Sequence, residues 1–195
     1  MKKNVSLLIV LGVIALLIAW GASINNSLVT LEEDIKGKWA NVESSYQRRA
    51  DLIPNIVNTA KGYAEFEQET LTQVIEARSN ATKVTVDPTN ISPEELAKFE
   101  QAQSGVSSSL SRLLVTFERY PDLKANENFS ELINELERTE NRINVERNRF
   151  NGSVQSFNTK VRRFPTSLAA SMFGFEQHGY FESAEGASVA PTVEF

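Results

Sequence analysis

The sequence of 195 residues contains no cysteine. This absence excludes disulfide bonds, zinc–thiolate and iron–sulfur sites, a thiol nucleophile and lipid attachment through cysteine. Glycine is also sparse, and the 9 glycines are scattered, so that none forms a phosphate-binding loop, a dinucleotide fingerprint or a nucleophile elbow. The short motifs that would identify many enzyme classes are therefore missing.

Histidine and positive charge are scarce as well. The single histidine, His178, excludes a metal site built from several histidines, including the Glu-x-x-His pairs of di-iron bundles. We expect His178 to be a solvated residue of the C-terminal tail. Lys and Arg number 20 against 25 Asp and Glu, and the net charge of −5 argues against nucleic-acid binding through a broad positive field. We predict no metal, no cofactor and no nucleic-acid partner.

What the sequence does contain begins with an uncharged apolar run from Val5 to Ala22, preceded by Lys2 and Lys3. About 20 apolar residues suffice to cross a bilayer as a helix, and Trp20 stands where an interfacial aromatic residue would lie. A cleaved signal peptide shares the positive start and the apolar run. However, this run is long for a signal peptide, and Trp20 interrupts the small residues of a cleavage site. We predict a retained transmembrane anchor over residues 1–25.

The orientation of that anchor depends on nearly balanced positive charges. Lys2 and Lys3 precede the run, whereas Lys36 and Lys38 follow it. Acidic residues after the run, such as Glu32, count for little in the positive-inside rule. The balance favours, by a small margin, an N-terminus inside and the remaining chain outside the cytoplasmic membrane, and it leaves the opposite orientation open.

Three stretches after the anchor carry apolar residues at alternating steps of three and four, which is the stripe of a packed helix. The first runs from Leu28 to Ile75 and contains Pro54, so we expect a kink or a break near residues 51–54. The stretch 80–91 is polar and is predicted to be a loop. The second helix is predicted to start at Ser92, with Pro93 at its first position and Glu95 completing a capping box, and to end at Pro121.

The third stripe is the most regular. It starts near Asn126 or Asn128, either of which can cap the helix, and it ends at Pro165. Its large apolar residues recur at intervals of seven and predict one core stripe: Phe129, Leu136, Ile143, Phe150, Phe157 and Phe164.

Together these stretches predict an all-α fold in which a transmembrane helix precedes an antiparallel bundle of three or four long helices over residues 26–165. A parallel oligomeric coiled coil is the alternative, but the short connection 120–126 favours chain reversal. Residues 166–181 are predicted to form an aromatic closing segment, and residues 182–195 a flexible acidic tail.

Several strings along the chain resemble the signatures of the LemA family. Trp39–Val42 with Gln47–Asn55, Tyr120–Phe129, and Thr139–Ile143 with Arg149–Asn151 resemble its first, second and third signatures. Phe164-Pro165, Met172–Phe175 and Tyr180-Phe181 resemble its closing segment. The resemblance implies a bacterial single-pass membrane protein with a helical-bundle domain and supplies no catalytic residues. Magnetosome membrane proteins of the MamQ type are relatives of that family, which suggests roles in membrane organisation.

The first candidate site is a set of polar residues near Pro54 and in the third stripe. Arg48 and Arg49 are adjacent, so they point about 100° apart on a helix and cannot share one face. We expect one of them to face the core and to meet a glutamate where the third stripe becomes polar. We expect this set to align the bundle, and a partner or ligand pocket at the kink is the alternative. The members are Arg48, Arg49, Asp51, Pro54, Asn55, Glu140, Arg142 and Glu146.

Two further candidates lie near the C-terminus. Met172, Phe173, Phe175, Tyr180 and Phe181 form an aromatic patch, which could cover the end of the bundle or contact a membrane or a partner. The last residues, Val193, Glu194 and Phe195, could serve as a C-terminal peptide ligand.

These features lead to one functional expectation and one alternative. We expect a non-enzymatic scaffold or protein-interaction module held at the membrane, which contacts lipid through its N-terminal helix and binds a protein of unknown identity. The alternative is a membrane-shaping or lipid-surface-binding protein.

Overall fold

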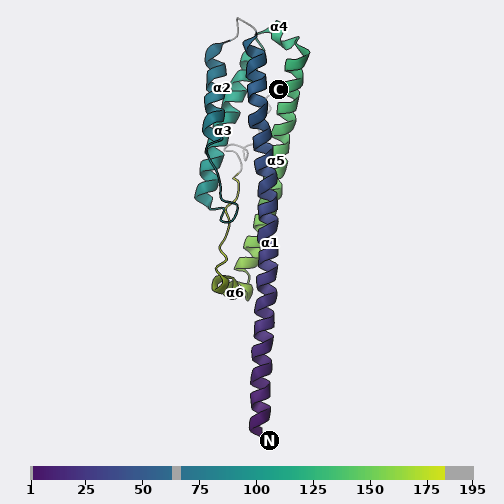
Figure 1. Cartoon of the computed structure of the whole chain (residues 1–195), viewed down its shortest axis with the longest axis vertical. Coiled ribbons are helices and arrows are strands. Elements are labelled where there is room, and N and C mark those ends of the chain that lie inside the picture. The colour runs from purple at the N-terminus through teal and green to yellow at the C-terminus, as the bar shows by residue number, and fades with distance from the viewer. Residues whose placement is uncertain (1, 63–66, 183–195) are drawn as a thin grey trace, which may run out of the picture. The chain divides into compact units, whose positions relative to one another are not determined.

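A computed structural model describes residues 2–62 and 67–182, and in that part of the chain all regular structure is helical (Figure 1). The helices are α1 (Lys2–Lys61), α2 (Gln68–Ala81), α3 (Pro93–Phe117), α4 (Pro121–Lys124), α5 (Glu127–Arg162) and α6 (Thr166–Phe173). The predicted all-α class is confirmed. The last residues of the predicted tail, 183–195, lie outside the described residues, and the predicted domain boundaries stay predictions.

The chain divides into two compact units, which are described separately. Unit 1 comprises Met1–Leu52, Pro88–Asn90 and Ile133–His178, and unit 2 comprises Ile53–Asp87, Ile91–Leu132 and Gly179–Phe195. The long helices α1 and α5 each contribute residues to both units.

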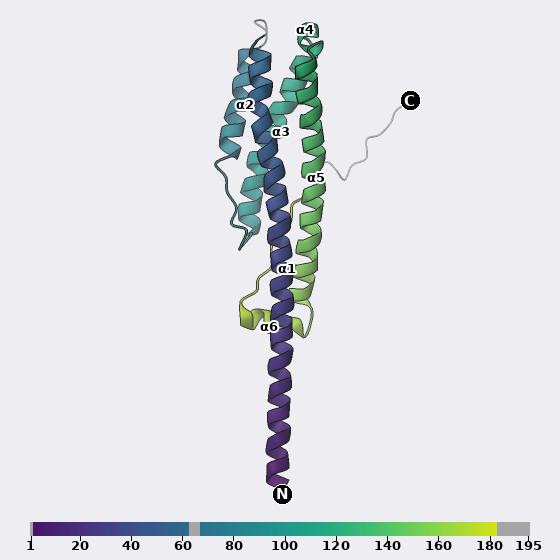
Figure 2. The ribbon, with the colours of Figure 1, turned by 45° about the vertical axis from the view of Figure 1, so that its right-hand side comes forward.

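Unit 1 is built on the antiparallel pairing of α1 with α5 (Figure 2). Ser27 of α1 meets Lys160 of α5, and Trp39 contacts Phe150 with ring centroids 5.6 Å apart. Residue numbers rise along α1 as they fall along α5, so the two helices run in opposite directions. The apolar stripe predicted for α1 is buried in this unit, because Leu28, Ile35, Trp39 and Val42 are all at most 2% exposed.

Unit 2 contains a second antiparallel pair, α2 with α3. Arg119, two residues after the end of α3, forms an ion pair of 3.1 Å with Glu67 just before α2, and Arg112 of α3 donates a hydrogen bond to Gln73 farther along. The apolar stripe of α3 is buried as predicted, including Phe99, Val106 and Leu113. Antiparallel helix pairs thus occur in both units, as the sequence predicted.

The predicted helix ends are confirmed at two starts. The Ser92 hydroxyl accepts a hydrogen bond from the backbone N–H of Glu95, which caps α3 as predicted, and it donates one to the Glu95 carboxylate. The Asn126 side chain accepts a hydrogen bond from the backbone N–H of Phe129 and caps α5.

Pro54 does not break the first helix, because α1 continues through it to Lys61. The interruption lies later, at Gly62, whose N–H bonds to the carbonyl of Thr59 in a closing turn. A break over residues 51–54, one of the two predicted alternatives, is therefore wrong, whereas a kink there stays a prediction. The packing of Ile53 and Ile56, both fully buried, favours helix on either side of the proline.

Two predictions near the end of α5 are wrong. Phe164 is 77% exposed and does not extend the core stripe. The reason is that α5 ends at Arg162, and a spacing of seven residues places side chains on one face only within a continuous helix. His178 is buried rather than solvated. Its backbone N–H donates to the Asn158 side-chain oxygen and its carbonyl accepts from the Asn158 amide, so the chain after α6 is tied back onto α5.

Candidate functional site

The polar residues predicted from the sequence include one ion pair whose arginine is buried. Arg49 of α1, 2% exposed, donates from Nη1 to Oε1 of Glu140 on α5 across 2.8 Å. Its guanidinium carbon also lies 5.0 Å from the ring centroid of Tyr46. The arginine of the first helix thus meets a glutamate of the last, and the aromatic ring adds a cation–π contact.

The neighbouring arginine forms a second pair on the surface. Arg48 donates from Nε (3.0 Å) and Nη2 (2.6 Å) to the same oxygen, Oε1 of Glu135. Arg138 donates to the other oxygen, Oε2, across 3.4 Å. The hydrogen bond from the Arg48 side chain is the main cause that lowers the pKa of Glu135 from its ordinary value. The ionised carboxylate is therefore favoured in the fold.

Glu146 lies on α5 and is 4% exposed. Its Oε1 accepts a hydrogen bond of 2.8 Å from Arg149, whereas its Oε2 is buried without a hydrogen-bond partner among the described residues. A half-satisfied buried carboxylate costs free energy. The polar break in the third stripe is thus a real feature of the interior. The sequence analysis, however, expected a glutamate there to pair with an arginine of the first helix, and it did not anticipate a carboxylate oxygen without a partner.

The remaining predicted residues do not join this set. Asp51 accepts a hydrogen bond of 2.8 Å from Gln47 on the surface of α1, and Arg142 is exposed on α5. Pro54, half-buried, and Asn55, exposed, belong to unit 2. The predicted cluster therefore divides into the Arg49–Glu140 pair, Arg48 in a surface pair with Glu135, the buried Glu146, and four residues separate from these.

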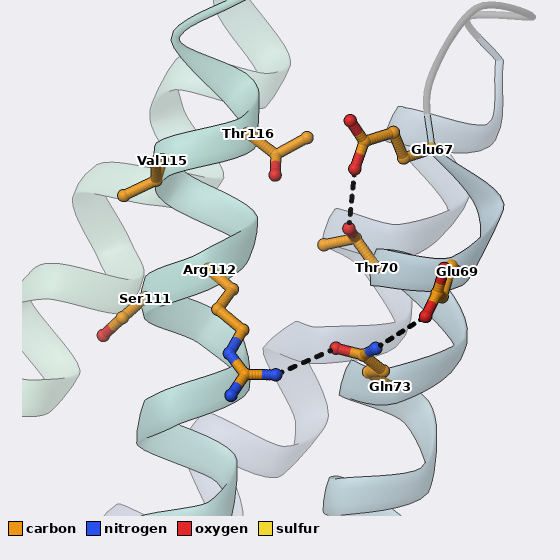
Figure 3. A pocket seen from close by; sticks show the side chains of 8 residues that line it. All are labelled: Glu67, Glu69, Thr70, Gln73, Ser111, Arg112, Val115 and Thr116. Atoms are coloured by element: carbon orange, nitrogen blue, oxygen red, sulfur yellow. Dashed lines mark hydrogen bonds between the residues drawn. The ribbon is translucent and has the colours of Figure 1, made fainter.

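A feature that the sequence analysis missed is a shallow groove between α2 and α3 in unit 2 (Figure 3). It has a volume of about 510 Å³, and a second groove of about 490 Å³ shares Gln73 and Arg112 with it. Arg112 reaches across to Gln73, which in turn donates to Glu69 across 3.3 Å. The residues that line the first groove are Glu67, Glu69, Thr70, Gln73, Ser111, Arg112, Val115 and Thr116.

The lining of this groove is polar apart from Val115, which is 69% exposed. Small side chains on the matching face of α3, Ala102, Gly105 and Ser108, leave room in the second groove. The available signal in the sequence was the run of small residues from Ser104 to Ser111. These small residues form a groove only because α2 packs against this face of α3, and the periodicity of the sequence does not reveal that packing.

The predicted aromatic patch is divided in the structure. Met172 (83%) and Phe173 (48%) are exposed on α6, and Tyr180 is exposed separately at 44%. Phe175 is half-buried with its ring edge-on to Phe157, 6.2 Å between centroids, whereas Phe181 is buried. The C-terminal candidates Val193, Glu194 and Phe195 lie outside the described residues.

The sequence of this chain matches the LemA family model over residues 38–195. The chain belongs to the LemA family. It is similar to "Protein LemA" of Metamycoplasma hominis, with 30% identity over 118 residues, which is 60% of this chain and 50% of the relative. It is also similar to "Magnetosome protein MamQ 2" of Paramagnetospirillum magneticum, with 25% identity over 174 residues, 80% of this chain and 64% of the relative. The chain thus spans one half to about two thirds of the length of these relatives.

The Arg49–Glu140 pair, the Arg48–Glu135 pair and the groove all lie inside the part that matches the LemA family, whereas the apolar start of α1 precedes it. By length and composition, α1 contains a segment able to cross a membrane. Within residues 2–62 and 67–182, no group of three or more His, Asp or Glu side chains is placed to hold a metal ion. The absence of a cofactor and of catalysis stays a prediction for this LemA-family chain.

Proposed function

We propose that this LemA-family protein is a single-pass protein of the cytoplasmic membrane whose helical part acts, without catalysis, as a scaffold or protein-interaction module. The observation that carries the proposal is the continuity of α1 in unit 1. The exposed apolar stretch that starts at Leu7 passes without interruption into the stripe that packs on α5. One helix thus serves as anchor and as core element, so the helical part is held at the membrane without a flexible linker.

The groove between α2 and α3 is the surface we propose for the protein partner. Its walls carry both donors and acceptors, with Arg112, Glu69 and Gln73 connected to one another and the exposed Val115 beside them. A polar lining with one apolar contact suits a transient interface better than an obligate one. The charged groups are near the surface, so they would select the partner more than they would add affinity.

The test is site-specific photo-crosslinking in cells that express the full chain. Val115→p-benzoylphenylalanine places the probe in the groove, and the same substitution at Val145, 46% exposed on α5, is the matched control. We expect a discrete cross-linked protein from position 115, which is lost on Arg112→Glu and is absent from position 145. Identical products from both positions, or none at 115, would contradict the proposal.

The proposed orientation places the N-terminus inside and the helical part outside the cytoplasmic membrane, as the positive charges favour by a small margin. Because the chain has no cysteine, Ser104→Cys provides a single label site on an exposed position of α3. A membrane-impermeant maleimide should label it in intact cells as well as in lysed cells. Labelling that requires lysis would reverse the orientation and move the search for a partner to the cytoplasm.

A second candidate function, binding to or shaping of a lipid surface, is favoured by one specific observation. Leu168, Met172 and Phe173 of α6 are exposed although they are large and apolar. Flotation of the chain from residue 25 onward with anionic vesicles would support this function, and its loss on Phe173→Ser would locate it. A fragment that stays in the soluble fraction would remove this candidate.

A further inference from the structure

Helix α6 lies beside α1 at the level where the apolar run of α1 ends. Phe173 Cζ is 3.9 Å from the position that a Cβ on Gly21 would occupy, and Gly21 is one residue before the end of that run at Ala22. Both views show α6 lying across the axis of α1 rather than along it (Figures 1 and 2). If α1 crosses a bilayer, α6 therefore lies roughly in the plane of its surface.

The two faces of α6 differ. Ala169 and Ala170 are buried, and they are small enough for the helix to approach the rest of the unit closely. Leu168 is 61% exposed and Met172 83% exposed. The helix itself, Thr166–Phe173, carries no charged residue. A short uncharged helix with an exposed apolar face is costly to keep in water, because every exposed aliphatic group forgoes burial.

Basic residues lie immediately before α6, and the first of them, Lys160, contacts α1 at a level different from that of α6. Lys160 Nζ donates to Ser27 Oγ, and Ser27 is six residues beyond Gly21, or about 9 Å along a helix. Arg162 and Arg163 are exposed at the end of α5. Between Lys160 and His178 the charged residues are three basic ones and Glu176. Apolar and basic groups are thus stacked in the order in which acyl chains and phosphates occur at a bilayer surface.

We propose that α6 is a second membrane contact, in which Leu168 and Met172 enter the interfacial layer of the bilayer that α1 spans, and Arg162 and Arg163 contact lipid phosphates. This proposal rests on the proposed membrane anchoring by α1. A lipid surface fits the patch better than a soluble protein does, because Phe173 of α6 lies beside Gly21 at the end of the apolar run, and the preceding residue, Trp20, is 42% exposed. With two contacts, rotation of unit 1 about the axis of α1 would be restricted.

The proposal is tested with the full chain in vesicles of phosphatidylcholine and phosphatidylglycerol. Met172→Cys and, as the matched control, Gln155→Cys on the exposed side of α5 each receive an environment-sensitive fluorophore. We expect the label at 172 to be blue-shifted and to be quenched several-fold more than the label at 155 by lipids that carry a nitroxide near the headgroup. Adding Arg162→Gln and Arg163→Gln should reduce the quenching at 172.

The outcomes separate the inference from the proposed function. Protein that floats with the vesicles while its label at 172 behaves like the label at 155 overturns the lipid contact and leaves the anchor intact. Protein that does not float overturns both. A blue shift of the label at 172 that disappears when the protein is diluted into excess lipid would show that a second copy of the chain covers the patch. This outcome would also overturn the inference.

Discussion

Two stretches of α1 are equally helical but distribute their apolar side chains differently. From Leu7 to Ile18 large apolar residues occupy all sides of the helix, and every one of them is at least 47% exposed. From Ile24 to Ala50 they occupy one stripe, and most of that stripe is at most 8% exposed. The first stretch has no packing partner in the described structure, whereas the second packs on α5.

The difference shows that the surroundings of a helix are encoded by the arrangement of its apolar residues rather than by their number. A helix that is apolar all round suits lipid, and a stripe at steps of three and four suits a neighbouring helix. The change occurs between Gly21 and Ile24 without any interruption of backbone structure. Substitutions in one stretch should therefore affect membrane insertion, and substitutions in the other should affect folding.

The largest effect on folding is expected at Trp39 in the packed stretch, and Trp20, two residues after the first stretch, provides the comparison. Trp39, 2% exposed, packs edge-on against Phe150, so Trp39→Ala should lower the free energy of unfolding by about 3–5 kcal/mol. Trp20→Ala, at a position 42% exposed, should change it by less than about 0.5 kcal/mol. The measurement is guanidinium unfolding in detergent followed by far-ultraviolet circular dichroism. Equal losses of stability in the two variants would contradict the division of α1.

A charge in the first stretch should have the next largest effect, on insertion rather than on folding. Ile14 lies in the middle of the apolar run, and arginine at the centre of a membrane helix costs about 2.5–3.5 kcal/mol. Val29, 41% exposed on the same helix but beyond the run, provides the control. Alkaline extraction of membranes should release Ile14→Arg and retain Val29→Arg. Release of both variants to the same extent would place the membrane boundary beyond Ala22.

The features predicted correctly from the sequence are local or periodic. The cap at Ser92 involves residues three apart, and the stripes that contain Trp39 on α1 and Phe150 on α5 each follow from spacing alone. Such patterns require no knowledge of the rest of the fold. This is why the helices, most of their ends and the buried stripes could be predicted.

The features that were missed depend on where distant segments meet. His178 is buried because Asn158, 20 residues earlier, holds its backbone at both hydrogen-bonding groups. The groove exists because α2 faces small residues of α3, such as Gly105. In the candidate site, a charge pair between Arg49 and a glutamate could be anticipated, whereas the unpartnered oxygen of Glu146 could not. No periodic signal encodes these long-range contacts.

Within the packed stretch, the adjacent arginines should differ in importance. Arg49→Met removes a buried guanidinium and leaves Glu140, itself about one third exposed, partly able to regain water, so we expect a loss of about 1–3 kcal/mol. Arg48→Met breaks a surface pair and should cost less than about 1 kcal/mol. Denaturant midpoints measure both. Restoration of stability by the double variant Arg49→Met, Glu140→Leu would show that the unpaired glutamate caused the loss, and equal losses for the two single variants would contradict the assignment.

The smallest expected effect concerns protonation of Glu135. The hydrogen bond from Arg48 lowers the pKa of this carboxyl, so the pair stabilises the fold while Glu135 is ionised. That contribution is fully present above the ordinary glutamate pKa and is lost as the pH falls through the lowered pKa of the folded state. Because both partners are near solvent, the titration is best followed directly, by the carboxyl carbon shift of Glu135 in nuclear magnetic resonance spectra.

In Arg48→Met the titration midpoint of Glu135 should rise toward the ordinary value. It should rise further in the double variant with Arg138→Met, because Arg138 still donates to Oε2 in the single variant. Glu135→Gln identifies the resonance. A midpoint that does not change in Arg48→Met would mean that the surface pair does not persist in solution. In that case only the ion pair of the buried Arg49 would stabilise the fold, and the pair of Arg48 would contribute nothing.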